Sequence, residues 1–230
     1  FQGMLCYVRQ DGVTGDVQVK PLGRERLLLD VSDAAIWEKH MRNGDIVVID
    51  PPSKYVNILL DKGEYVHIPQ LCGVARQPYF YGDFQFSNRE GYDYSSGIFG
   101  AFRSEDFELP ETPSLEQARQ ALDELKSLLS EFRFQSPRDR DAALAAMFTA
   151  VVRPSLPAAP MFHVRAPQIA SGKSYLCNLL AAFAGPGTPS ASAFPENQEE
   201  SQKLVFSLLM DSPAVVIFDN LTSDLLPYTS

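Results

Sequence analysis

Apolar and polar positions alternate with a short period over the first half of the chain. In residues 4–107, apolar stretches such as DIVVID, YVHIP and PYFYGDFQF are separated by turn residues, as at 82–83 and 88–91. This pattern is typical of strands joined by tight turns. One helix is predicted within it, over SDAAIWEKHMRNG, with Ser32 as its N-cap and Gly44 just after its end. The first half is therefore predicted to be β-rich.

The period lengthens to that of a helix after LPETPS at 109–114. Ser114 lies three residues before Gln117, which is the spacing of a capping box. The apolar positions that follow share one helical face: Leu115, Ala118, Leu122, Leu125 and Leu129. A second helix is predicted over SPRDRDAALAAMFTAVV, with Ser136 as N-cap and Pro137 at the first helical position. These two helices are predicted to form a connector.

The last third predicts strands and helices in alternation. MFHVR at 161–165 is a strand candidate, and a loop leads from it into a helix over about 172–184. A linker rich in Gly, Pro and Ser covers 185–194, and a further helix covers about 196–210. PAVVIFDN then has the pattern of a buried strand that ends in Asp219. This order predicts an α/β unit.

Together the patterns predict an α/β protein in three parts. These are a β-rich N-terminal domain at 4–108, a helical connector at 109–153 and an α/β domain at 154–230. Residues 1–3 have the pattern of a remnant left by tag cleavage. We therefore expect Met4 to be the natural start and expect no signal peptide.

Composition narrows the classes of function. Of the 230 residues, 45% are hydrophobic and 21% are charged, which allows a buried core. Apolar runs such as 179–183 are far shorter than the roughly 20 residues of a membrane span, so no membrane association is expected. The three cysteines are widely spaced and odd in number, which predicts a reducing, cytoplasmic location. Neither they nor the three isolated histidines have the spacing of metal ligands, so no thiolate or imidazole metal site is expected. The formal charge of −9 disfavours a simple basic nucleic-acid-binding module, although an oligomer can still form a local basic surface.

RAPQIASGKSYLCNLL at 165–180 has most features of a phosphate-binding loop. Gly172 lets the backbone approach a phosphate, Lys173 supplies a mobile positive charge, and the Ser174 hydroxyl can reach a magnesium ion. The motif GxxxxGK[ST] has a glycine where this chain has Pro167, which fixes φ and donates no hydrogen bond. The alternative interpretation is that GKS begins an ordinary helix.

A second acidic element favours the nucleotide interpretation. Asp219 ends the predicted strand VVIFD, where its carboxylate would hold the Mg²⁺ that Ser174 also contacts. Many ATPases of this class have a catalytic glutamate at the next position, whereas this chain has Asn220, whose amide can orient a water molecule but cannot accept its proton. Three glutamates are alternative bases, although a solvated helix start explains them more simply: Glu196, Glu199 and Glu200. The predicted site is therefore catalytic Lys173, Asp219 and Asn220, nucleotide-binding Gly172, Lys173 and Ser174, and metal-binding Ser174 and Asp219.

An aromatic run in the β-rich part has two interpretations. Exposed rings could stack nucleic-acid bases, whereas rings that face one another across strands would pack the sheet. Few cations lie nearby, so the pattern favours sheet packing. The run comprises Tyr79, Phe80, Tyr81, Phe84, Phe86, Tyr92, Tyr94, Phe99 and Phe102.

RDRDAALAAMFTAVVRPSLPAAPMFHVRAPQIASGKSYL, with PENQEESQKL and VVIFDN after it, resembles the primase- and helicase-associated P-loop ATPases of phages, plasmids and integrative mobile elements. IPQLCGVARQPYF and GYDYSSGIF are similar to the segment before the ATPase core of that group. The resemblance covers most of the chain from about Pro51 and implies that 154–230 is the N-terminal part of an AAA+-like or superfamily-3-like P-loop domain. It implies ATP and Mg²⁺ as cofactors. It also implies a homo-oligomeric ring that hydrolyses ATP and acts on single-stranded DNA, as a helicase or primase-helicase of a mobile element. A primase is implied as a further partner.

The resemblance assigns Lys173 and Ser174 to phosphate and magnesium, and Asp219 to the Walker B acid. It also implies a sensor strand and an arginine finger after Asp219, and neither is found before the last residue, Ser230. We therefore expect this chain to bind nucleotide weakly and to turn it over at below about 1 s⁻¹. Two other functions stay open: a nucleotide-binding regulatory or interaction module without efficient hydrolysis, and a metabolic P-loop kinase.

Overall fold

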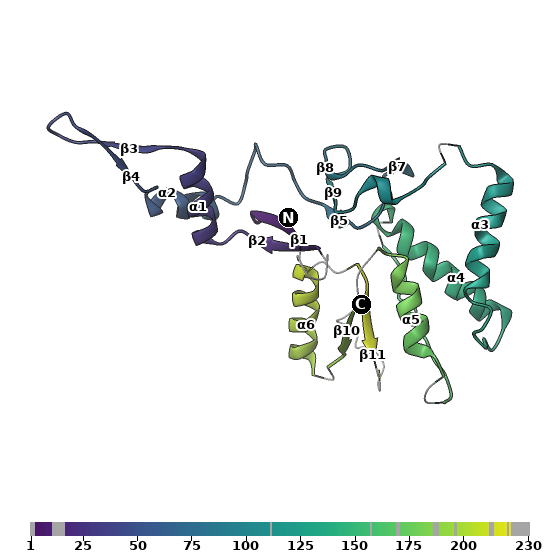
Figure 1. Cartoon of the computed structure of the whole chain (residues 1–230). Coiled ribbons are helices and arrows are strands. Elements are labelled where there is room, and N and C mark those ends of the chain that lie inside the picture. Colours follow the sequence, from purple (N-terminus) through teal and green to yellow (C-terminus); the bar gives the residue numbers. More distant parts are fainter. Residues whose placement is uncertain are drawn as a thin grey trace.

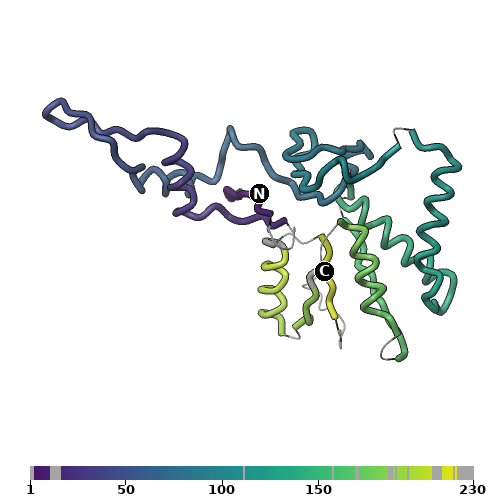
Figure 2. The backbone as a smooth tube through the Cα atoms, in the orientation of Figure 1, coloured from purple at the N-terminus to yellow at the C-terminus, as the bar shows by residue number. Residues whose placement is uncertain are grey.

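The computed structural model describes residues 3–10, 17–110, 112–156, 158–168, 171–185, 189–195, 197–211, 214–219 and 221. Within these residues the chain is a mixed α/β protein with six α-helices and several small sheets. Its outline is elongated, because residues 24–61 extend to one side as an arm (Figure 1). Figure 2 follows the backbone out along this arm and back.

The arm follows a two-stranded antiparallel ribbon of β1 (Cys6–Gln10) and β2 (Val17–Pro21). It consists of two helices and one antiparallel hairpin: α1 (Arg24–Ala34), β3 (Trp37–His40), β4 (Ile46–Ile49) and α2 (Ser53–Asp61). The strand predicted from DIVVID is thereby confirmed as β4.

The helix predicted over residues 32–44 is wrong. Ser32 lies inside α1 instead of capping a helix, and the chain then forms β3. Gly44 lies in the turn of the β3–β4 hairpin with a φ of +92°. The β-branched residues of β4 favour a strand, and Trp37 stacks on Tyr55 of α2 with ring centroids 6.2 Å apart. Cross-strand pairing and this contact outweigh the local helical pattern.

Five short strands form the rest of the β-rich part: β5 (Gly73–Ala75), β6 (Tyr79–Tyr81), β7 (Gln85–Ser87), β8 (Gly91–Asp93) and β9 (Ile98–Gly100). β5, β9 and β8 make one sheet, and β6 pairs with β7 in the hairpin predicted from PYFYGDFQF. YVHIP forms a turn and not the predicted strand. Phe80 and Phe86 are cross-strand partners with ring centroids 5.4 Å apart, so sheet packing is confirmed for this pair of the aromatic run.

A buried polar network stabilises this region. Asp93 is 3% exposed, and its Oδ2 accepts hydrogen bonds from the hydroxyls of Tyr79 (3.1 Å) and Ser87 (3.0 Å). Its Oδ1 accepts a third from the Ser95 N–H at 2.9 Å. Burial alone would raise the pKa of Asp93, but these hydrogen bonds hold it below its ordinary value. The carboxylate is therefore a structural acceptor.

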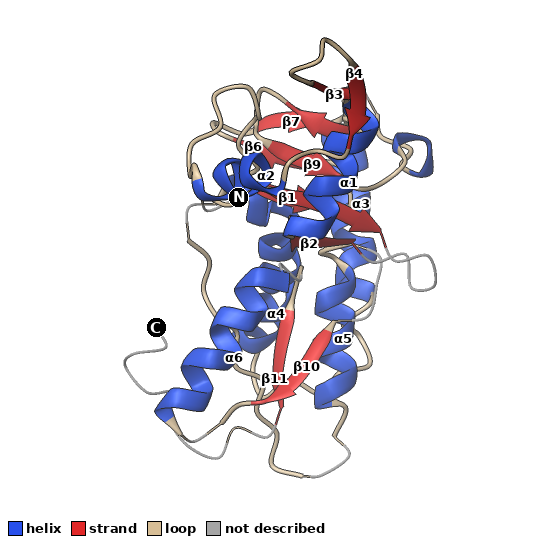
Figure 3. Ribbon diagram, turned by 90° about the vertical axis from the view of Figure 1, so that its left-hand side faces the viewer, coloured by secondary structure: helices blue, strands red, loops and turns tan. Residues whose placement is uncertain are grey.

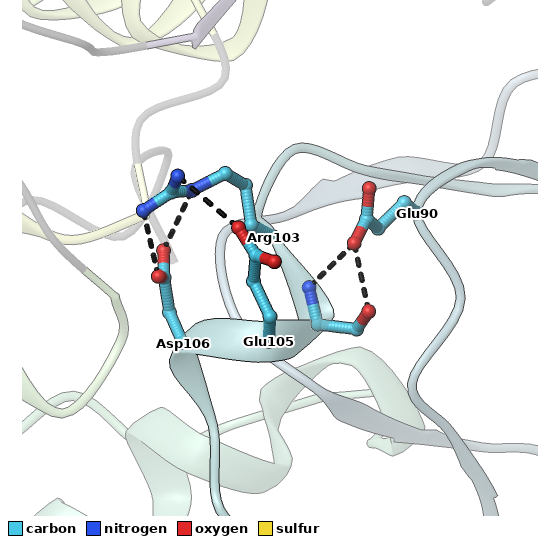
Figure 4. A network of polar contacts seen from close by, with 5 residues as sticks. Glu90, Arg103, Glu105 and Asp106 are labelled. Carbon is cyan, nitrogen blue, oxygen red and sulfur yellow. Dashed lines mark hydrogen bonds and ion pairs between the residues drawn. The ribbon is translucent and has the colours of Figure 1, made fainter.

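A second network, of hydrogen bonds and ion pairs between exposed side chains, lies in the same region (Figure 4). Oε1 of Glu90 accepts hydrogen bonds from the N–H and the hydroxyl of Ser104, at 2.6 and 2.7 Å. Arg103 donates two hydrogen bonds to Asp106, at 2.7 and 3.1 Å, and pairs with Glu105 at 3.2 Å. The Glu90 contacts fix the short 3-10 helix η1 (Ser104–Asp106) against the residue that directly precedes β8.

Both predicted connector helices are confirmed, as α3 (Leu115–Ser127) and α4 (Pro137–Val152). Ser114 and Gln117 form the expected capping box, and Ser136 caps α4. α5 (Lys173–Ala182) then packs against α4, as the predicted helix after the loop. α4, α5 and the segment after α3 enclose an apolar core of Leu129, Ala143, Met147 and Leu176.

The last described strands, β10 (Ser190–Ala193) and β11 (Val216–Asp219), run parallel and are joined through α6 (Gln198–Asp211) (Figure 3). α6 and β11 confirm two predictions, although β11 is only half-buried. The predicted linker 185–194 is wrong in part, because β10 lies within it and pairs with β11. The predicted strand 161–165 is also wrong: no described strand pairs with this segment, so its backbone has no ladder to join.

The end of α5 is bonded to the β-rich part. Gln77 Nε2 donates a hydrogen bond to the carbonyl oxygen of Phe183, one residue after α5, at 2.7 Å. The neighbouring Arg76 is 6% exposed and donates from Nη2 to the carbonyl oxygen of Val17 in β2, also at 2.7 Å. These contacts join segments that are far apart in the sequence.

Candidate nucleotide-phosphate site

Gly172 starts α5 in a conformation that favours glycine. It is the N-cap, with a φ of +85° in the left-handed region. Among the described residues, a Cβ at this position would meet only Cε1 of Phe132 within 4 Å, at 3.8 Å. No side chain of the described residues caps α5, in contrast to α3 and α4. The first N–H groups of α5 therefore lack a side-chain acceptor and can bind an anion.

Lys173 and Ser174 occupy the first turn of α5, and both are exposed. Leu176 is 7% exposed and lies in the core formed with α4, so this end of the helix is fixed by packing. The helix thus presents a cation and a hydroxyl at the end where its dipole is positive. This is the arrangement predicted from GKS.

Asp219 is the last residue of β11 and is exposed. The C-terminal end of β11 and the start of α5 lie at the same end of the molecule, at the bottom of Figure 1. Cys177, one turn into α5 from Lys173, responds to both charges. Burial raises the pKa of the Cys177 thiol, Asp219 raises it further, and Lys173 lowers it. The predicted lysine and aspartate therefore act electrostatically on the same thiol, although they are far apart in the sequence.

The remaining predicted site residues divide into two groups. Asn220, Glu196 and residues 169–170 of the loop lie outside the described residues. Glu199 and Glu200 lie in the first turn of α6, where both are exposed and pair with Lys203 at 2.8 and 3.4 Å. Their contacts are those of a solvated helix start.

Three residues beside the loop were not predicted as part of the site. The sequence around Cys177 gives no signal of a role in the site, because the effect of Asp219 on this thiol depends on where β11 lies. Phe132 and Tyr175 form a ring stack next to Gly172. Tyr175 directly follows GKS, and this is the one sequence signal that it lies near the loop. The sequence around Phe132 contains no such signal.

The residues predicted to hold magnesium are one hydroxyl, Ser174, and one carboxylate, Asp219. Within the described residues, no group of three or more His, Cys, Asp and Glu side chains is arranged to hold a metal ion. One carboxylate and one hydroxyl suffice for Mg²⁺ when phosphate oxygens and water supply the other ligands.

In the part of the chain that the structure describes, no helix is both long and apolar enough to span a bilayer.

Comparisons with protein-family models, with curated proteins and with solved structures give no match to this chain.

Proposed function

We propose that the chain binds Mg²⁺ and ATP at the start of α5, as part of a DNA helicase or primase-helicase of a mobile genetic element. The observation that carries the proposal is that the start of α5, with Lys173 and Ser174, and the C-terminal end of β11, with Asp219, lie at one end of the molecule although they are distant in sequence. A lysine that follows a left-handed glycine, with a carboxylate from a strand end at the same end of the molecule, is the charge arrangement that a bound nucleotide needs.

Each residue has a defined task in this proposal. The N–H groups that follow Gly172 would bind phosphate oxygens, and Lys173 would neutralise the terminal phosphates. The Ser174 hydroxyl and the Asp219 carboxylate would hold Mg²⁺, which neutralises charge on the phosphates when bound. Asn220 would orient the water that attacks the terminal phosphate.

The motor activity rests on the resemblance of the sequence to the primase- and helicase-associated ATPases. A homo-oligomeric ring, single-stranded DNA and a primase partner belong to this part of the proposal. The second candidate is a regulatory or interaction module that binds nucleotide without efficient hydrolysis. Two sequence features favour it: Pro167 replaces the first glycine of the loop, and Asn220 replaces the usual glutamate.

The test measures ATP binding by calorimetry and ATP turnover with and without single-stranded DNA. Lys173→Ala is compared with Lys39→Ala, which removes an exposed lysine from the distant β3 strand. We expect Lys173→Ala to weaken ATP binding roughly ten- to a hundredfold, because it removes a charge-assisted contact, and Lys39→Ala to leave it unchanged.

The outcomes separate the candidates. Turnover that DNA stimulates and that Lys173→Ala abolishes supports the motor. Lys173-dependent binding without turnover supports the regulatory module. If wild-type protein does not bind ATP, or if both lysine variants bind it equally well, the nucleotide site itself is wrong.

A further inference from the structure

An aromatic stack lies directly beside the candidate phosphate loop. The rings of Phe132 and Tyr175 have centroids 5.9 Å apart and planes inclined by 26°. Phe132 comes from the segment between α3 and α4, whereas Tyr175 lies in the first turn of α5. The edge of the Phe132 ring is the neighbour that a Cβ on Gly172 would meet. The stack and the loop therefore share one position in the fold.

The two rings differ in how they are held. Phe132 is half-buried, packs against the core that α4 and α5 form with Leu129, and also contacts Phe134 with ring centroids 6.1 Å apart. Tyr175 is 71% exposed, so most of its ring faces solvent. The core face of α5 is provided by residues such as Leu176. Tyr175 is thus a large exposed ring that stacks on a half-buried one, beyond what core packing requires.

The position suits the far end of a nucleotide. Tyr175 lies about 3 Å along the helix axis from Lys173, since each residue rises about 1.5 Å. Residues two apart lie on different faces of a helix, so the Tyr175 ring lies on a different face of α5 from Lys173. A nucleoside triphosphate has the same polarity, with a charged phosphate chain at one end and a flat aromatic base at the other.

We infer that the Phe132–Tyr175 pair is the surface on which the base of a bound nucleoside triphosphate stacks. This inference rests on the proposed nucleotide site and adds the residues that hold the base. The base would contact Tyr175, while Phe132 fixes the angle of that ring. Stacking on an aromatic ring contributes through the face that every base presents, so it strengthens binding without reading base edges.

The experiment compares a ligand with a base and a ligand without one. Affinities for ATP and for inorganic tripolyphosphate, each with Mg²⁺, are measured on wild-type protein, Tyr175→Ala and Tyr175→Phe. Tyr94→Ala is the matched control, because Tyr94 is also an exposed tyrosine (77%) paired with another ring, that of Tyr92 at 4.9 Å. Alanine is the best helix former, so Tyr175→Ala leaves α5 intact, which circular dichroism checks.

We expect Tyr175→Ala to bind ATP about tenfold more weakly or worse, with tripolyphosphate affinity unchanged. Tyr175→Phe, which keeps the ring, and Tyr94→Ala are expected to bind both ligands as wild type does. Unchanged ATP affinity in Tyr175→Ala, or an equal loss for both ligands, overturns the base-stacking role and leaves the phosphate site standing. Failure of wild-type protein to bind either ligand through Lys173 overturns the proposed function as well.

Discussion

Replacing Gly172 by alanine separates the backbone requirement of the loop from its chemistry. Gly172 has a φ of +85°, and an L residue in this left-handed region costs about 1–2 kcal/mol. The added Cβ would lie 3.8 Å from Cε1 of Phe132, an ordinary contact that adds no clash. We therefore expect the free energy of unfolding to fall by about 1–2 kcal/mol, which lowers the melting temperature by roughly 2–8 °C in a chain of this size.

Gly44→Ala is the matched control for this variant. Gly44 has a φ of +92°, and a Cβ there would meet no atom of the described residues within 4 Å. It should lose the same stability, measured by thermal unfolding with circular dichroism, and keep wild-type affinity for ATP. Gly172→Ala should in addition bind ATP about tenfold more weakly, because its methyl group lies where the phosphates approach. A stability loss above about 4 kcal/mol, or equal ATP affinity in the two variants, would refute this reasoning.

Two further predictions concern titrating groups. Because hydrogen bonds depress the pKa of Asp93, its stabilising effect is complete above its ordinary value of 3.8 and is lost as the pH falls through the lowered pKa. Asp93→Asn should therefore cost about 1–3 kcal/mol at neutral pH and progressively less in acid, and denaturant unfolding at several pH values measures this; a cost that grows in acid contradicts it. For Cys177, Asp219→Asn should lower the thiol pKa and Lys173→Ala should raise it. Rates of alkylation against pH, in a chain whose other two cysteines are serine, should thus shift in opposite directions; a shift in the same direction would show that the two charges do not meet at this thiol.

Local signals predicted the elements that local interactions determine. The caps at Ser114 and Ser136 depend on side chains within three residues of each helix start, and both are present. The β6–β7 hairpin likewise depends on its own turn. By contrast, β3 needs the pairing partner β4, and β10 needs β11, which is distant in sequence. The sequence of β3 has a helical pattern, and that of β10 is rich in serine. Both segments become strands only because they pair with β4 and β11, so the sequence alone did not predict them.

The candidate site divides in the same way. Gly172, Lys173 and Ser174 belong to one motif, so the sequence places them together at the start of a helix. The ring contact between Phe132 and Tyr175 arises only because α4 packs on α5 and brings the segment before α4 onto the loop. No periodicity in the sequence encodes that contact.

The parallel pairing of β10 with β11 also orders the events of folding. Residues 194–215 separate the two strands, and closing this crossover costs chain entropy before the strand pairing compensates for it. Helices such as α5 form from local contacts in about a microsecond, whereas parallel pairing between distant segments is slow. Asp219 is therefore expected to reach its position after Lys173. During refolding, recovery of ATP affinity would then lag behind recovery of helical signal.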